Sequence, residues 1–412
     1  MQTIAVVLLA FLLLQAVLLF ISSWRQHVNR SRQQELSLER LQTQIDAAKQ
    51  ELAHRQRLHR LSWQGYRKFE VKTKTPEGDS GICSFQLVPH DSKPLPPYQP
   101  GQFLTFKLSI PGQKKPVIRC YSLSDCYRES ADHYRVTIKK ISAPADKPKA
   151  PPGLASSFFY DHLNEGDILD VKAPAGQFVL DLKRDVPVVL LAGGVGITPL
   201  LSMLNAIVAS GQSRETWLFY GVRNRAEHIM KEHMDRIRRD FDNVHICSCY
   251  SDQAATDTQG HDYHCAGRIT IDLLKEKLPS NNYEFYICGP PPMMAALTEG
   301  LKGWGVPQTA IKSEAFGAAS VQKAARAVKA KITFTKSKKD IAWDPQAGNL
   351  LEFALRNGIP IDSGCRAGSC GTCKVALRDG KIEYVQESEF DCEPGSCLTC
   401  LAMPKGDITL DA

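Results

Sequence analysis

Cysteine residues are concentrated near the C-terminal end of the chain. Thirteen occur among 412 residues, and six of these lie between Cys365 and Cys400. The first three, Cys365, Cys370 and Cys373, follow the pattern C-x4-C-x2-C, and Cys392, Cys397 and Cys400 come later. This spacing is typical of 2Fe–2S centres, which need anionic sulfur ligands, whereas structural zinc sites prefer C-x2-C pairs. We therefore predict an iron–sulfur centre held by the first three cysteines and one of the later three.

A glycine-rich turn follows a continuous apolar run over residues 186–192. Its sequence is Gly193-Gly194-Val195-Gly196-Ile197-Thr198-Pro199, and a helical pattern comes next. Glycines between a buried strand and a helix N-terminus let a pyrophosphate approach free backbone N–H groups. Thr198 is expected to be the N-cap of the helix, with Pro199 at its first position. The turn therefore predicts a dinucleotide site.

Several short motifs between residues 100 and 178 contain residue types that are suited to binding a flavin. Arg119-Cys120-Tyr121-Ser122 offers a guanidinium for pyrophosphate, an aromatic ring for stacking and a hydroxyl for the flavin edge. Gly153-Leu154-Ala155-Ser156 offers a close backbone approach and a serine at a helix start. Each motif alone is more often a turn or a surface strand than a binding site, so their combination carries the prediction.

Two kinds of domain must position these motifs. Short alternating runs at residues 69–74, 83–88, 103–109 and 134–141 predict the strands of an antiparallel barrel or sandwich. Buried-type runs at residues 186–192, 216–220, 244–250 and 283–287 alternate with helical stretches, which predicts a doubly wound parallel sheet. The last run ends in Cys288-Gly289-Pro290-Pro291, at the strand end where such sheets bind ligands.

In order and spacing, these motifs resemble the ferredoxin–NADP reductase superfamily, and the reductase half of flavohaemoglobins in particular. The resemblance implies FAD, with FMN as the lesser alternative, and a C-terminal β-grasp ferredoxin domain. It selects Cys400, in the pattern Leu398-Thr399-Cys400, as the fourth cluster ligand. It also implies that Cys288 lies beside the nicotinamide and Glu314 near both rings. The remaining cofactor-binding residues that it implies are Arg119, Tyr121, Ser122, Gly153, Ser156, Phe316, Gly193, Gly194, Gly196, Thr198, Gly289 and Pro290.

The sequence distinguishes NADH from NADPH less clearly than it indicates the flavin and the cluster. Arg223 and Arg225 could meet the 2′-phosphate of NADPH, whereas Asp252 would repel a phosphate and accept from a ribose hydroxyl. We therefore expect NADH in preference to NADPH. His261, His264 and Cys265 form one short cluster without a second pair, so we interpret it as a loop and not as a metal site.

The N-terminal segment is expected to be a membrane anchor. Residues 4–21 are apolar except for Gln15, and Arg25 follows Trp24, which predicts a single-pass transmembrane helix with the catalytic domains facing the cytoplasm. A cleaved signal peptide is the alternative. Residues 25–68 carry ten Lys or Arg and four Asp or Glu, so six of the seven net positive charges lie there. Nucleic-acid binding is therefore excluded for the rest of the chain.

The expected organisation is a transmembrane anchor (1–24), a helical stalk (25–63), an FAD-binding β-barrel (64–184), an α/β NAD(P)-binding domain (185–315), a linker (316–330) and a ferredoxin domain (331–412). The expected function is an electron-transfer reductase that passes electrons from NAD(P)H through FAD and the 2Fe–2S cluster to a redox protein such as an oxygenase, desaturase or cytochrome. The alternative is a terminal quinone or oxygen oxidoreductase, or a redox sensor, without a protein acceptor.

Overall fold

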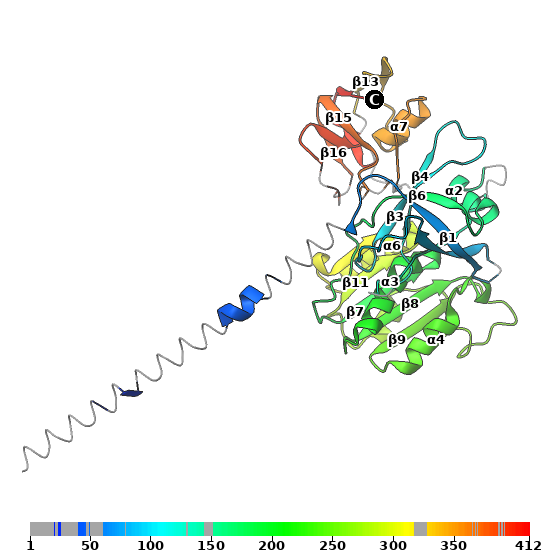
Figure 1. The fold of residues 1–412 in the computed structure, drawn as a ribbon, viewed down its shortest axis with the longest axis vertical. Helices are drawn as coiled ribbons and strands as arrows, with labels where there is room; N and C mark the ends of the chain where they lie inside the picture. The colour runs from blue at the N-terminus through cyan, green and yellow to red at the C-terminus, as the bar shows by residue number, and fades with distance from the viewer. Residues whose placement is uncertain are drawn as a thin grey trace, which may run out of the picture. The chain divides into compact units, whose positions relative to one another are not determined.

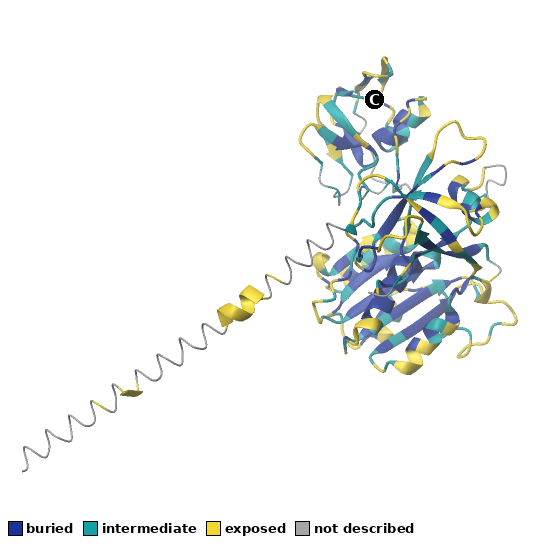
Figure 2. Cartoon of the chain, viewed as in Figure 1, coloured by how far each residue is buried: buried dark blue, intermediate teal, exposed yellow. Residues whose placement is uncertain are grey.

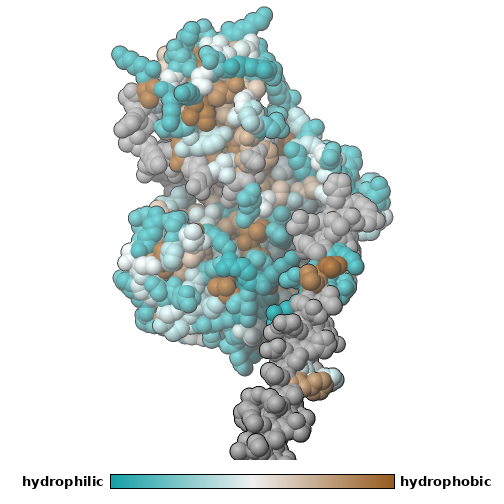
Figure 3. All heavy atoms as spheres, turned by 90° about the vertical axis from the view of Figure 1, so that its left-hand side faces the viewer, coloured by the Kyte–Doolittle hydropathy of each residue, from teal (hydrophilic) through white to brown (hydrophobic). Residues whose placement is uncertain are grey.

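The computed structural model divides the chain into two units, residues 1–62 and 63–412. It describes residues 20, 24–25, 40–46, 49, 61–78, 80–128, 131–143, 151–316, 328–364, 366, 368, 370–385, 388, 390 and 392–412. Three domains follow one another in the second unit (Figure 1), and their buried residues lie along the strands (Figure 2). On the face drawn in Figure 3, hydrophobic side chains form small separate patches among hydrophilic ones, as is usual for folded domains.

The prediction of an N-terminal transmembrane helix, and with it of a single-pass membrane protein, is contradicted. Among the residues that the structure describes, no helix is both long enough and apolar enough to cross a bilayer. Most of residues 4–21 lie outside the described residues, and Phe20 and Trp24, which are described, are exposed. An apolar run indicates what a segment tends to bury, but it does not by itself establish a continuous helix of bilayer length.

The first domain of the second unit is the predicted antiparallel barrel. Its six strands run in the order β4-β3-β6-β1-β2-β5, and an isolated bridge between Leu123 and Val136 joins the two ends. Phe69, Phe85 and Phe106 fill the interior and are fully buried. The strands are β1 (Arg67–Pro76), β2 (Ile82–Pro89), β3 (Phe103–Leu108), β4 (Val117–Ser122), β5 (Tyr134–Lys139) and β6 (Ile168–Val171), with helix α2 (Leu154–Ser157) and a π-helical turn η1 (Phe158–His162) before β6.

The second domain is the predicted parallel sheet. Its strand order, β10-β9-β8-β7-β11-β12, places the strand before the glycine-rich turn beside the strand that ends in Cys288. The strands are β7 (Val188–Gly193), β8 (Thr216–Val222), β9 (Val244–Tyr250), β10 (Cys265–Ala266), β11 (Glu284–Cys288) and β12 (Ile311–Glu314). The helices are α3 (Ile197–Ser210), α4 (Lys231–Asp240), α5 (Ile271–Lys277) and α6 (Pro291–Gly303), with 3-10 turns η2 (Gly194–Gly196), η3 (Arg225–Glu227) and η4 (Gln308–Ala310).

Helix α3 begins earlier than the sequence predicts. The 3-10 turn η2 runs directly into α3, whose N-cap is Gly196, without a side-chain cap. Thr198 therefore lies inside the first turn, where its hydroxyl donates to the carbonyl oxygen of Val195 at 3.0 Å. The prediction of Thr198 as N-cap is wrong because the glycine turn is itself helical and extends the helix toward the strand.

The third domain has a mixed five-stranded sheet in the order β14-β13-β19-β15-β17 and a separate pair, β16-β18. Leu350, Leu351 and Phe353 of helix α7 pack into its core. The elements are β13 (Lys331–Phe334), β14 (Lys339–Ala342), the 3-10 turn η5 (Pro345–Ala347), α7 (Leu350–Arg356), β15 (Lys374–Asp379), β16 (Ile382–Tyr384), β17 (Ser396–Leu398), β18 (Ala402–Pro404) and β19 (Ile408–Leu410). The three-domain layout predicted from the sequence is thus confirmed.

Candidate active site

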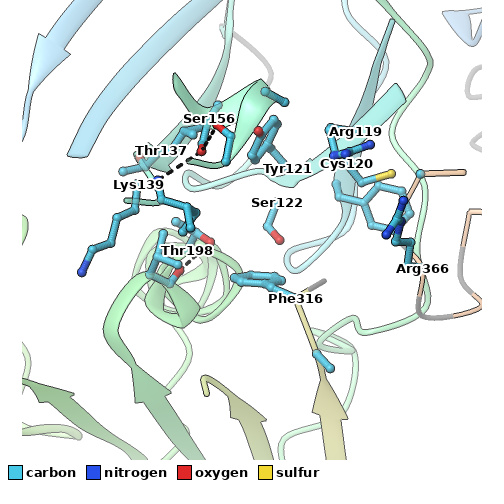
Figure 4. Close-up of a pocket in the computed structure, with 18 of the residues that line it drawn as sticks. Arg119, Cys120, Tyr121, Ser122, Thr137, Lys139, Ser156, Thr198, Phe316 and Arg366 are labelled. Atoms are coloured by element: carbon cyan, nitrogen blue, oxygen red, sulfur yellow. Dashed lines mark hydrogen bonds between the residues drawn. The ribbon is translucent and has the colours of Figure 1, made fainter. Parts of the chain in front are cut away.

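A cavity of about 390 Å³ brings together most of the predicted flavin-binding residues. Its size lies within the range usual for ligand sites. Phe316 faces Ser122 across the cavity, and Arg119 and Arg366 lie together at one end (Figure 4). The predicted residues that line it are Arg119, Tyr121, Ser122, Gly153, Ser156, Thr198, Glu314 and Phe316. The structure therefore places side chains from all three domains around one space.

Strand β4 supplies the R-x-Y-S residues from one end of the barrel. Burial and the neighbouring Arg366 lower the pKa of Arg119, because two guanidinium charges lie close together. The Nε atom of Arg366 is buried and has no hydrogen-bond partner within the described part of the chain. Arg366 also donates to Glu352 through Nη1 at 3.0 Å, so its buried Nε is the donor that remains, beside Arg119, for a phosphate group. The residues present thus fit the pyrophosphate of FAD.

Gly153 and Ser156 shape the opposite wall of this cavity. The Ser156 hydroxyl accepts from the backbone N–H of Ile141 at 3.1 Å and donates to the carbonyl oxygen of Gly153 at 3.0 Å. A Cβ atom on Gly153 would lie 2.8 Å from the Cβ of Ile141. Gly153 is therefore required for the close approach of two chain segments, and Ser156 holds these segments together.

The glycine-rich turn packs directly against the end of β11. A Cβ atom on Gly196 would lie 2.2 Å from the carbonyl oxygen of Cys288, and one on Gly193 would lie 2.7 Å from Cδ of Pro290. Gly194 has a φ of +54°, and no atom lies within 4 Å of the position that a Cβ would take, so this position is open space. Gly289 lies against Gly193 as well. These glycines bring two strand ends together beside an open space that a pyrophosphate can enter.

Cys288 and Glu314 are register partners on β11 and β12. Cys288 is fully buried, and burial together with the Glu314 charge raises the pKa of its thiol well above the usual range. The Ser122 hydroxyl donates to the Glu314 carboxylate at 3.4 Å. Glu314 thus connects the R-x-Y-S strand with the strand that ends at Cys288. Cys288 itself is not among the cavity-lining residues.

Two of the predicted cluster ligands, Cys373 and Cys400, lie next to each other. The Sγ atoms of Cys373 and Cys400 are 3.1 Å apart, and both residues are almost fully buried. Cys365 lies outside the described residues. A Cβ atom on Gly364 would lie 2.9 Å from Sγ of Cys370, so this glycine allows the loop to fold tightly around the sulfur. The close pair of thiols fits ligands that share one iron ion.

Arg366 and Cys120 are among the cavity-lining residues that were not predicted as site residues from the sequence. Arg366 adds a second guanidinium group to the cavity wall. Cys120 also lines the cavity, and its Sγ atom would lie 3.3 Å from a Cβ atom added to Gly364. Arg366 directly follows Cys365 in the sequence, but this position does not indicate that its side chain lines the cavity. Cys120 could have been predicted to line the cavity because it stands between Arg119 and Tyr121 in the R-x-Y-S motif.

The two arginines expected near a 2′-phosphate are paired with carboxylates. Arg223 donates to Glu227 through Nε at 3.0 Å, and Arg225 donates to Glu232 at 3.0 Å. Asp252 is exposed. Both guanidinium groups thus already have anionic partners within the protein.

Comparison with known families identifies each domain. A model of the oxidoreductase FAD-binding domain matches residues 69–180, one of the oxidoreductase NAD-binding domain matches residues 190–299, and one of the 2Fe-2S iron-sulfur cluster binding domain matches residues 334–405. The chain thus carries the FAD-binding and NAD-binding domains of oxidoreductases, followed by a C-terminal 2Fe–2S domain. The domain order of this oxidoreductase is the one predicted from its motifs.

Curated relatives resemble the flavin and nucleotide domains of this oxidoreductase. It is 37% identical over 257 residues to the flavohemoprotein of Halalkalibacterium halodurans, a match that covers 62% of this chain and 61% of that protein. It is 36% identical over 261 residues to the flavohemoprotein of Bordetella pertussis, covering 63% of this chain and 62% of that protein. The chain thus spans less than two thirds of the length of the flavohemoproteins that it matches.

Solved structures extend the likeness to all three domains. The FAD/NAD-binding domain of a nitric oxide dioxygenase from Vibrio cholerae is 29% identical with a TM-score of 0.53, over 62% of this chain and all of that chain. Phthalate dioxygenase reductase is 25% identical with a TM-score of 0.53, over 84% of this chain and 98% of that chain. The second match includes the 2Fe–2S domain, which the first does not contain.

Proposed function

We propose that this oxidoreductase passes electrons from NADH to an external redox protein through its FAD and 2Fe–2S domains. FAD held by these residues would supply hydride acceptance and the release of single electrons, and a 2Fe–2S cluster would supply one-electron transfer. The observation that carries the proposal is that Gly364 and Arg366, which flank the first cluster ligand, line the same cavity as Tyr121 and Ser122. This arrangement supports a short route from flavin to cluster.

The residues of the chain have separate roles in this proposal. Arg119 and Arg366 hold the flavin phosphates, Tyr121 stacks against the ring system, and Ser122 hydrogen-bonds the flavin edge. Gly193, Gly194, Gly196, Gly289 and Pro290 form the surface on which the nucleotide pyrophosphate lies, with Thr198 fixing the turn. Glu314 and Cys288 orient the nicotinamide, and Phe316 excludes water from the rings. Cys365, Cys370, Cys373 and Cys400 bind the cluster.

An external protein acceptor is supported by the likeness to phthalate dioxygenase reductase, which is described as a modular structure for electron transfer from pyridine nucleotides to 2Fe–2S. An oxygenase, a desaturase or a cytochrome is the proposed type of acceptor. The second candidate function is a terminal oxidoreductase that reduces quinone or oxygen and needs no protein acceptor.

NADH is the proposed donor because Arg223 and Arg225 are engaged by Glu227 and Glu232. A 2′-phosphate would have to displace one of these carboxylates, while the exposed Asp252 suits a ribose hydroxyl. Comparison of kcat/KM for NADH and NADPH tests this choice. At least a tenfold preference for NADH is expected, and equal values would contradict it.

The electron route is tested with the holoprotein under anaerobic conditions. Titration with NADH should bleach the flavin absorption and produce the EPR signal of a reduced cluster. The purified protein should then reduce cytochrome c, and a cluster-free Cys400→Ser variant should lose this activity while it still reduces ferricyanide. Flavin bleaching without a cluster signal would refute the route. Rapid turnover with quinone, but none with cytochrome c, would favour the second candidate function.

A further inference from the structure

Three cysteines outside the flavin cavity and the 2Fe–2S ligands meet at one edge of the nucleotide domain. Cys247 and Cys249 lie two residues apart on β9, and Cys265 begins β10, the edge strand of the sheet. Residues two apart on a strand point to the same face. Cys265 is the register partner of Cys249 in the parallel pair β10-β9. All three thiols therefore gather on one face of the sheet.

The three sulfur atoms are close enough to share one ion. Each Sγ atom lies within 4.8 Å of the other two, and the Sγ atoms of Cys247 and Cys265 are 3.3 Å apart. A tetrahedral zinc ion with Zn–S bonds of about 2.3 Å places its sulfur ligands about 3.8 Å from one another. Only small rotations of the side chains are needed to reach that spacing.

The three cysteines differ in their exposure to solvent, which increases from the sheet interior to its edge. Cys249 is fully buried, Cys247 is 6% exposed and Cys265 is half-buried. Phe219, Leu274 and Leu278 belong to the same apolar cluster as Cys247 and Cys249. The apolar surroundings shield the inner side of the trio, while the Cys265 side leaves a position that solvent can reach.

Lys277, in the last turn of α5, provides a nearby positive charge. The pKa of Cys265 is raised to about 11 by burial and by the Cys247 thiol, and Lys277 opposes this rise. The pKa of Cys247 is also raised, chiefly by its side-chain hydrogen bond with Cys249 and by burial, with Lys277 again opposing. Three thiolates around a divalent ion have one net negative charge, which an ammonium group partly balances.

We propose that Cys247, Cys249 and Cys265 form a binding site for one thiophilic divalent metal ion of the zinc type. Three S–H bonds lose their protons to the buffer, three metal–sulfur bonds form, and no electron is transferred. Water occupies the fourth position on the side of Cys265. A disulfide between Cys247 and Cys265 is a weaker interpretation because it would leave the buried Cys249 unused.

The proposal is tested by titrating the reduced holoprotein with Cd²⁺, which gives an ultraviolet thiolate-to-cadmium absorption band. One equivalent is expected to bind while the iron content and the cluster spectrum stay unchanged. Cys247→Ser and Cys265→Ser should each weaken binding by at least about tenfold, since each removes one of three ligands. Cys83→Ser, which changes a buried thiol of the barrel, is the matched control and should bind like the unaltered protein.

A second measurement does not depend on the variants folding. N-ethylmaleimide should modify the half-buried Cys265 of the metal-free protein, and Zn²⁺ should protect it, as peptide mass spectrometry would show. Binding of less than one equivalent, equal binding by Cys265→Ser, or no protection would overturn the proposal. So would a Cys247–Cys265 disulfide that forms in preference to metal binding when the reduced protein is exposed to air and Zn²⁺ together.

Discussion

The hydroxyl of Ser122, on the last residue of β4, donates to the carboxylate of Glu314, on the last residue of β12, at 3.4 Å. This bond connects two residues that are 192 positions apart in the chain. Glu314 is also the register partner of Cys288. The carboxylate therefore lies where the flavin barrel and the nucleotide sheet meet, and its removal should affect the chemistry more than the fold.

Replacement of Glu314 by glutamine is expected to slow flavin reduction by NADH about tenfold or more, because the neutral amide no longer orients the groups around it. Anaerobic stopped-flow absorption at the flavin band measures this rate, and the steady-state KM for NADH should change less than kcat. Glu299→Gln, on the exposed part of α6, is the matched control and should leave the rate unchanged. Equal rates for both variants would argue against a role for Glu314.

Cys400 is expected to be the fourth cluster ligand. Cys400→Ser should abolish the EPR signal of the reduced cluster and lower the iron content, because a serine hydroxyl is a poorer ligand than a thiolate. Cys392→Ser is the matched control, since Cys392 competes for this role by sequence and is only partly buried. Retention of a normal cluster in Cys400→Ser, with its loss in Cys392→Ser, would reverse the assignment.

Gly196 is expected to be essential for the packing of the glycine-rich turn. In Gly196→Ala the new methyl group would lie 2.2 Å from the carbonyl oxygen of Cys288, so the two strand ends must separate. We expect a loss of about 1–3 kcal/mol in the free energy of unfolding and a raised KM for NADH. Gly211→Ala, with a φ of +66° and open space around it, should cost about 1 kcal/mol without a change in KM. The same KM in both variants would contradict the expected role.

The carboxylate of Glu227 connects β5 with the nucleotide domain through Lys139 at 2.8 Å. Although burial opposes the shift, hydrogen bonds from Arg223 and Lys139 lower the pKa of Glu227 from 4.5 to about 2. A lowered pKa in the folded state means that the bonds stabilise the protein above pH 4.5 and that this stabilisation is lost as the pH falls toward 2.

Glu227→Gln is therefore expected to lower the free energy of unfolding by up to about 3 kcal/mol at pH 7, and by progressively less below pH 4.5. Urea unfolding at several pH values, followed by tryptophan fluorescence, measures the difference from the unaltered protein. Glu232→Gln removes an exposed ion pair and should change stability by less than about 1 kcal/mol. A pH-independent loss in Glu227→Gln would rule out the ionic explanation.

Local patterns predicted the domains because each motif combines residue types with a strand or helix boundary. The barrel runs, the run before Gly193 and the cysteine spacing all belong to continuous short segments, so the sequence alone identifies them. The pairing between strands that are distant in the sequence cannot be identified from such short segments. The pairing of β9 with β10 brings Cys265 to Cys247 across seventeen intervening residues, whereas the sequence grouped Cys265 with His264.

The inability of short sequence patterns to specify contacts and exact backbone geometry also explains the other differences between prediction and structure. Arg366 reaches the flavin cavity because of how two domains fold, which no local pattern encodes. The helical turn at Gly194–Gly196 moved the start of α3, since glycines do not distinguish an open loop from a 3-10 turn. The apolar N-terminal run was interpreted from composition alone, and the described residues contain no helix of the required length.

Strand β12 ends at Glu314, and Ala315 and Phe316 directly after it form part of the cavity wall. A chimaera that exchanges the iron–sulfur module for that of another reductase should therefore be joined after Phe316. A junction placed earlier would replace Ala315 and Phe316 in addition to Gly364 and Arg366, which the iron–sulfur domain itself contributes to the cavity, so more of the cavity wall would change in the exchange.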